Sequence, residues 1–460
     1  MRVRKRWAVL GVSVALVGVL AYFVIDLMWA TPAPRFNAAE RMDALVQGVQ
    51  PAGENSWPAY RAVLRGETPG AGVSSMPLPS SGERDLAWPS HPASVGAWED
   101  ARHDPWRKHL ADSALHMEEF IEATALPGFR RVLTSEFESL DAPLDIDPSV
   151  MPAQSLFEGI WTHLGPQRSF TRLLVAAMRS AVAAGEWNEF IRYARAGIRS
   201  GVHNTLQGIA LEWLVGFSQL TLVLSEVRLQ LAEREVPADV CAALLGAIRD
   251  AEALLPPSTH LVEVERALIQ DATQWAFDRK GRLVSWTISR SMFDLDDPPT
   301  FGERALNLLS PLHPGYEATA ATVDAYFDEA AKQARGELAD QAAVGERVDA
   351  NPVAYILMPA MFRVLRNTMY YRQQIAGTRV MLHLEIYHAE HGRWPDALAE
   401  AMPVEETICP GGDVAFEYVV RDDGYDLFIP ESAPSRRADG WESDDERCLT
   451  IGREPFPEGE

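Results

Sequence analysis

The apolar run WAVLGVSVALVGVLAYFVI, residues 7–25, constrains this chain more than any other feature. Its length, about 19 residues, suits a tilted helix that crosses the hydrocarbon core of a bilayer. Four cations stand before it, Arg2, Arg4, Lys5 and Arg6, and the first charge after it is Asp26. Because cationic flanks stay in the cytoplasm, we expect a single-pass inner (cytoplasmic) membrane protein whose bulk is extracytoplasmic, in the periplasm.

A cleaved signal peptide is the alternative interpretation of this run. Such peptides have an apolar core of about 7 to 15 residues and end in small residues at the cleavage site. Here the run is longer, Met28 and Trp29 crowd Ala30, and no cysteine for lipid attachment follows. We therefore favour an uncleaved signal-anchor, with residues 1–30 forming a cytoplasmic stub and the anchor.

Composition limits the partners of the remaining chain. The 460 residues are 47% hydrophobic, which is enough for two or three globular domains. The formal net charge of −23 disfavours binding to nucleic acid, which is itself a polyanion. The sequence therefore points to the inner membrane, through residues 7–25, and to an unidentified protein as partners.

The chain divides by composition into four parts after the anchor. They are a linker with a mobile loop (31–97), an irregular helical domain (98–351), a long helix with a small α+β head (352–452) and a tail (453–460). Residues 66–96 of the linker are rich in Gly, Pro and Ser, as exposed loops are. Residues 293–303 and 310–318 of the helical domain are also predicted to be loops.

Two stretches define the helical domain. In residues 170–201, apolar positions recur every three or four residues on both sides of Gly185, which predicts a hairpin of two helices. Residues 207–232 are apolar on almost all sides, so they form either a buried central helix or a second membrane segment. Because four polar residues interrupt them, we favour the buried helix. These are Glu212, Gln219, Glu226 and Arg228.

The long helix is predicted over residues 360–391, with one apolar seam and a solvated basic face that carries Arg363, Arg366, Arg372 and Arg379. Gly392 is suited to close it in the left-handed conformation, and Pro395 can start a second helix, DALAEAM. The alternation in VAFEYVV and YDLFI around Asp423-Gly424 predicts an antiparallel hairpin. The fold class is therefore mostly α, with a small C-terminal α+β head.

The segments LHLEIYHAEHGRWPDALAEAMP (382–403) and FEYVVRDDGYDLFIP (416–430) resemble the head of the type II secretion major pseudopilin family. With the prelude NPVAYILMPAMFRVLRN (351–367), the chain is similar to uncharacterised single-span envelope proteins of bacteria that carry this head after a helical domain. The prepilin-peptidase signature is absent and some 330 residues separate anchor and head. Filament assembly is therefore not implied.

Candidate metal ligands occur in two places. His383, His388 and His391 share the end of the long helix, but a His-Glu-x-x-His pattern is absent, so we assign no zinc site. In ADGWESDDE, Asp439, Asp444 and Asp445 are calcium candidates, and the resembled pseudopilin head also has a calcium loop after its sheet. A solvated acidic loop is the simpler interpretation.

The chain has three cysteines, and Cys409 and Cys448 lie close enough in sequence to form a disulfide in an oxidising compartment. Cys241 lies in an apolar helical stretch and is expected to be buried. Glu263 and Glu265 stand near a helix start without a visible cleft, so no catalytic residue and no cofactor is assigned. The sequence favours a non-enzymatic interaction or assembly module, and an envelope hydrolase or ligand-binding protein is the alternative.

Overall fold

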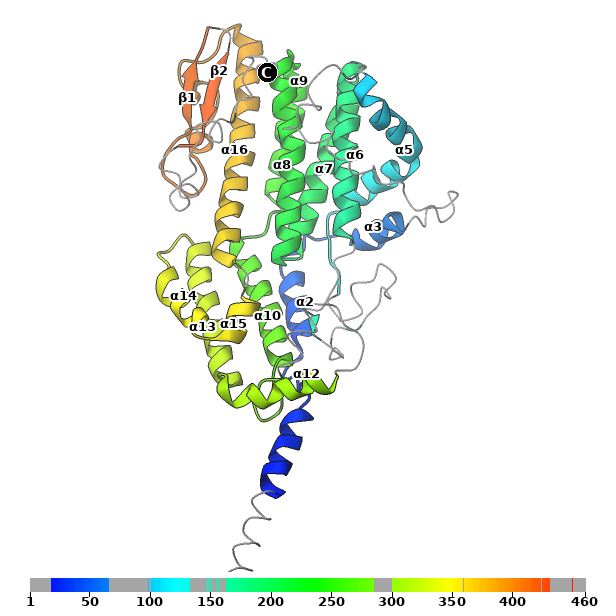
Figure 1. The fold of residues 1–460 in the computed structure, drawn as a ribbon. Helices are drawn as coiled ribbons and strands as arrows, with labels where there is room; N and C mark the ends of the chain where they lie inside the picture. Colours follow the sequence, from blue (N-terminus) through cyan, green and yellow to red (C-terminus); the bar gives the residue numbers. More distant parts are fainter. Residues whose placement is uncertain are drawn as a thin grey trace, which may run out of the picture.

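The computed structural model describes residues 18–65, 98, 101–132, 147, 149, 155–156, 163–284, 300–358, 360–422, 424–430 and 449. Within these ranges the chain is mostly helical, with one two-stranded antiparallel hairpin, as predicted. One set of helices stands side by side in the upper half of the body, a second set fills the lower half, and the N-terminal helix (Gly18–Met28) projects from the base (Figure 1).

The helices of the first half have these bounds: α2 Ala38–Gln47, α3 Trp57–Leu64, η2 Ala101–His103, α5 Asp104–Ala125, α6 Leu164–Ala183, α7 Trp187–Leu206, α8 Ala210–Glu233, α9 Ala238–Glu252 and α10 Ser258–Trp275. Helices α6 and α7 are the predicted hairpin. Their turn contains Gly185, whose φ of 73° lies in the left-handed region. The predicted loop at 66–96 lies outside the described residues.

The second half begins with α12 Phe301–Ala305, η4 Leu306–Leu312, α13 Tyr316–Ala334, α14 Gln341–Asp349, α15 Pro352–Leu357 and α16 Met361–His391. The head adds η5 Leu398–Glu400, α17 Val404–Thr407, β1 Glu417–Val420 and β2 Tyr425–Phe428. In the hairpin, Tyr418 pairs with Leu427 and Val420 with Tyr425. The predicted loops at 293–303 and 310–318 are wrong over 301–303, 310–312 and 316–318, which belong to α12, η4 and α13, whereas 293–299 lie outside the described residues.

Helix α8 is the central helix of the body. Among the described residues it alone is long and apolar enough to cross a membrane, yet most of it is buried inside the protein. Each polar residue that interrupts it has a partner in the body: Glu212 pairs with Arg131, Gln219 with Asn204, Glu226 with Arg179 and Arg228 with Thr378. The buried helix predicted for residues 207–232 is thus confirmed.

A close approach of backbones joins α7 to α8. A Cβ atom added at Gly216 would lie 2.4 Å from the carbonyl oxygen of Gly201, so neither helix tolerates a side chain there. This approach lets the side chains of Asn204 and Gln219 meet at 2.8 Å within the core. One apolar core then continues from α6 through α9 to α16 and the head.

The long helix α16 has the predicted ends but only part of the predicted solvated face, because Arg363 is exposed while Arg372 and Arg379 are partly covered. From residue 373 to 382 almost every side chain is buried, because α8 and α9 cover one side while Phe416 and Leu449 of the head cover the other. Arg379 forms an ion pair with Glu252 of α9 at 3.0 Å, and Arg372 donates to the carbonyl of Pro256. The two arginines are thus structural contacts of the helix bundle.

Gly392 closes α16 with a φ of 68°, as predicted. The second helix expected from Pro395 is wrong, since only the short η5 turn and the four-residue α17 form there. The chain is instead held by side chains: Tyr387 donates to Glu400 at 3.0 Å, and Tyr418 donates to the carbonyl of Pro395 at 3.0 Å. These contacts fold the bend back against the hairpin.

Candidate functional site

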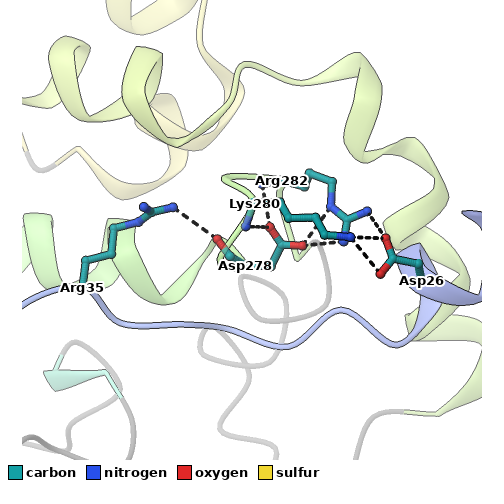
Figure 2. Close-up of polar contacts among 5 residues, drawn as sticks. All are labelled: Asp26, Arg35, Asp278, Lys280 and Arg282. Atoms are coloured by element: carbon teal, nitrogen blue, oxygen red, sulfur yellow. Dashed lines mark hydrogen bonds and ion pairs between the residues drawn. The ribbon is translucent and has the colours of Figure 1, made fainter.

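The junction between the N-terminal helix and the body contains a connected group of partly buried ion pairs (Figure 2). Asp26, near the end of the helix, accepts a hydrogen bond from Lys280 Nζ at 2.8 Å and one from Arg282 Nη1 at 2.6 Å. Both cations belong to the turn that follows α10. A segment 254 residues away in sequence therefore fastens the base of the helix.

Asp278 gives this turn its shape. Its carboxylate accepts from the backbone N–H groups of Lys280 and Arg282, each at 2.9 Å, and from the guanidinium of Arg282 at 2.8 and 2.7 Å. The turn passes through Gly281, whose φ is 75°. Arg282 thus bridges two carboxylates, and its contacts with Asp278 do not involve Asp26.

The extended segment after the helix is held along α10. Gln274 of α10 accepts from the backbone N–H groups of Arg35 and Phe36 at 2.6 and 3.0 Å, and donates to the carbonyl of Phe36 at 3.0 Å. The N–H of Ala33 donates to the carbonyl of Phe277 at 3.0 Å. The segment therefore pairs with the body through its backbone, independently of its own side chains.

Arg35 and Trp29 add two cation–aromatic contacts. The guanidinium of Arg35 lies 4.0 Å from the ring centroid of Tyr316, the first residue of α13, and donates to the carbonyl of Asp278 at 3.2 Å. Arg304 of α12 lies 4.7 Å from the ring centroid of Trp29. The segment that follows the N-terminal helix is thus tied to α10, α12 and α13.

The electrostatics of the junction favour a structural role for Asp26 over a catalytic one. Hydrogen bonds from Lys280 and then Arg282 hold the pKa of Asp26, which lies outside the predicted span, below its ordinary value. The carboxylate therefore stays ionised at neutral pH and keeps both cations. Such an arrangement can orient the helix relative to the body, whereas a general acid or base needs a pKa near the working pH.

The predicted calcium candidates Asp439, Asp444 and Asp445 lie outside the described residues, as does Cys448. Cys409 is buried, and burial raises the pKa of its thiol to about 12. Cys241 is also buried, as expected. The pairing of Cys409 with Cys448 stays a prediction.

The three histidines of α16 lie in different environments. His383 contacts Glu406 at 3.3 Å and Arg249 at 3.1 Å, where α9, α16 and α17 meet. His388 stacks on Trp394 with centroids 4.0 Å apart, and His391 stacks on Tyr387 at 4.1 Å. No group of three residues able to hold a metal ion occurs in the described part of the chain.

Sequence reasoning missed a buried polar cluster beside α8. Arg131 forms an ion pair with Glu212, and the Nε2 atom of His163 lies 3.3 Å from the same carboxylate. Burial and the charge of Arg131 lower the pKa of His163 well below its ordinary value, so this imidazole is neutral at pH 7. The sequence signal for this cluster is Glu212, a charged residue within an apolar stretch. Its partners Arg131 and His163 cannot be identified from the sequence because they lie far from it along the chain.

No protein-family model, no curated protein and no solved structure matches this chain, so the junction is interpreted from its own geometry.

Proposed function

We propose that residues 7–25 anchor the protein in the inner membrane and that the body, exported across it, acts as an interaction or assembly module without catalysis. One observation carries the proposal. The apolar side chains of the N-terminal helix are exposed, while Asp26 at its end is fastened to the body. These side chains are Val19, Leu20, Tyr22, Phe23 and Ile25.

Physical chemistry supports a lipid environment for this helix. Leaving a large apolar side chain in water instead of burying it costs about 1.5 to 3 kcal/mol. The helix extends away from the body, so the body does not cover these side chains (Figure 1). The burial of α8 supports residues 7–25 as the span, because α8 already has protein neighbours.

The proposed non-catalytic role rests on how the buried ionisable groups are used. Glu226 pairs with Arg179 at 2.7 Å, and Glu265 accepts from the backbone of α8. These contacts join helices to one another. A protein with a fixed, membrane-proximal body of this kind is suited to hold a partner at a set distance from the bilayer.

Topology is tested with reporters at the C-terminus of the full chain. Alkaline phosphatase folds only outside the cytoplasm and green fluorescent protein fluoresces when it folds inside, so we expect activity from the first and none from the second. Extraction at alkaline pH should leave the chain in the membrane pellet. A variant in which Arg2, Arg4, Lys5 and Arg6 are replaced by glutamate is the matched control and should lose its fixed orientation. Reporter activity confined to the cytoplasm would contradict the proposal.

The interaction role is tested separately. Cross-linking in intact cells, followed by mass spectrometry of the purified full chain, should recover the same partner from repeated preparations. Turnover of ester, peptide or glycan substrates by the purified chain, abolished by a single substitution of a buried polar residue in a variant that still folds, would instead support the hydrolase alternative.

A further inference from the structure

We propose that α12 and η4, residues 301–312, form a second membrane contact that lies in the headgroup layer of the extracytoplasmic leaflet. The inference rests on the proposed anchor at residues 7–25 and adds to it a specific lipid-facing surface. In Figure 1, α12 runs across the base of the body, crosswise to the N-terminal helix and at the level where that helix leaves the body. The expected partner is the bilayer that the anchor crosses.

The polarity of this segment is reversed relative to a water-facing surface. Two of its polar residues, Asn307 and Ser310, are buried. Its apolar residues point outward, with Phe301 78% and Leu312 79% exposed, and Leu308 and Leu309 exposed as well. Since water disfavours such a pattern and a lipid interface favours it, the four side chains point to an apolar environment outside the protein.

The depth of the segment follows from one contact. Arg304 of α12 lies over the ring of Trp29, which is 65% exposed. Trp29 stands four residues after the predicted span ends at Ile25, which is about 6 Å along a helix. Tryptophan and arginine both favour the boundary between headgroups and hydrocarbon, so their contact places α12 at that level.

Charge also favours a bilayer at this face. The chain as a whole is acidic, yet the turn that follows α10 exposes Arg279 and Lys280 beside Asp26 at the end of the N-terminal helix. Cations at this position can approach lipid phosphates, while the acidic remainder of the body is repelled from them. The ion pairs of Lys280 and Arg282 with Asp26 hold the turn and the anchor in one fixed arrangement. The cations and the apolar side chains can therefore reach the membrane together.

Site-directed spin labels on the full chain in vesicles of phosphatidylethanolamine and phosphatidylglycerol test the proposal. A single cysteine replaces Leu312 or Phe301 in a Cys448→Ser background, since Cys241 and Cys409 are buried. We expect the ratio of oxygen to nickel-chelate collision rates to be severalfold higher at both positions than at Leu338. Leu338, 96% exposed in the turn between α13 and α14, is the matched water-facing control.

A third label separates the failure of this inference from failure of the anchor. Phe23→Cys reports on the N-terminal helix itself. One outcome is that the label at residue 23 lies in lipid while the label at residue 312 is as accessible to water as the one at residue 338. This outcome overturns the interfacial contact and leaves the anchor intact. Water access at residue 23 overturns both. Strong spin–spin coupling between residue-312 labels at low protein density would show that a second copy covers this face, which also overturns the proposal.

Discussion

The carboxylate of Glu265 on α10 accepts a hydrogen bond from the backbone N–H of Ala210 at 2.9 Å. Ala210 is the first residue of α8, and the residue before it, Ile209, offers no side-chain cap. Glu265 therefore satisfies one of the free N–H groups at the start of the central helix from a neighbouring helix. The carboxyl group is fully enclosed, and burial raises its pKa to about 7.

This raised pKa predicts a pH-dependent stability. The folded state binds the Glu265 proton more tightly than the unfolded chain, whose ordinary pKa is 4.5. The resulting stabilisation is complete below about pH 4.5 and is lost as the pH rises through 7. Glu265→Gln keeps an acceptor for the N–H of Ala210. Its free energy of unfolding should therefore rise relative to that of the wild type as the pH increases from 5 to 8. Because one pKa unit corresponds to about 1.4 kcal/mol, the difference approaches about 3 kcal/mol.

Chemical denaturation at pH 5 and pH 8 measures this difference in the free energy of unfolding. Glu263→Gln is the control, because Glu263 is partly exposed two residues away and lies 3.7 Å from Arg266. It should show no comparable change with pH. Equal pH profiles for the wild type and Glu265→Gln would contradict the assignment.

Removing the carboxylate of Glu212 is predicted to destabilise the fold strongly. Glu212→Ala leaves the buried guanidinium of Arg131 without this partner, and breaking a buried pair from one side typically costs about 3 to 5 kcal/mol. Glu118→Ala is the matched control, since Glu118 pairs with Arg192 at 2.7 Å on the surface and such pairs contribute about 1 kcal/mol or less. Thermal unfolding of both variants measures the difference, and similar melting temperatures would contradict it.

Local patterns predicted the elements that depend on neighbouring residues in sequence. The hairpin around Gly185, the end of α16 at Gly392 and the strands on both sides of Gly424 all follow from periodicity and turn chemistry. The buried environment of α8 was also predictable, because the polar residues within it need partners that lipid does not supply.

Long-range contacts account for the errors. Arg372 and Arg379 have the spacing of a solvated face, but Arg372 donates to the carbonyl of Pro256 and Arg379 pairs with Glu252 of α9. The stretch DALAEAM has helical composition, yet it forms an irregular bend. Hydrogen bonds from Tyr387 to Glu400 and from Tyr418 to the carbonyl of Pro395 hold this bend. Asp26 is the first charge after the apolar run, but no sequence pattern links it to Arg282. Only the fold brings these two residues together.

Counting free thiols tests the predicted disulfide between Cys409 and Cys448 directly. Leu449, the neighbour of Cys448 in sequence, donates its N–H to the carbonyl of Leu427 at 2.8 Å, so the chain returns to the head that contains Cys409. We expect protein purified from the envelope and unfolded without reductant to show one reactive thiol, that of Cys241, and three after reduction. Cys241→Ser should show none before reduction. Three thiols in the unreduced wild type would exclude the pairing.

Gly392 is predicted to stabilise the end of α16 through its backbone alone. Its φ of 68° is costly for residues with a Cβ, and no atom lies within 4 Å of an added Cβ, so Gly392→Ala tests the conformation without a steric clash. The expected cost is about 1 to 2 kcal/mol. Gly246→Ala is the matched control, because Gly246 lies inside α9 with equally open space around an added Cβ. Alanine is the better helix former, so this variant should gain about 0.5 to 1 kcal/mol. Opposite shifts of the two melting temperatures are therefore expected, and a stabilising effect of Gly392→Ala would show that the left-handed closure of α16 is wrong.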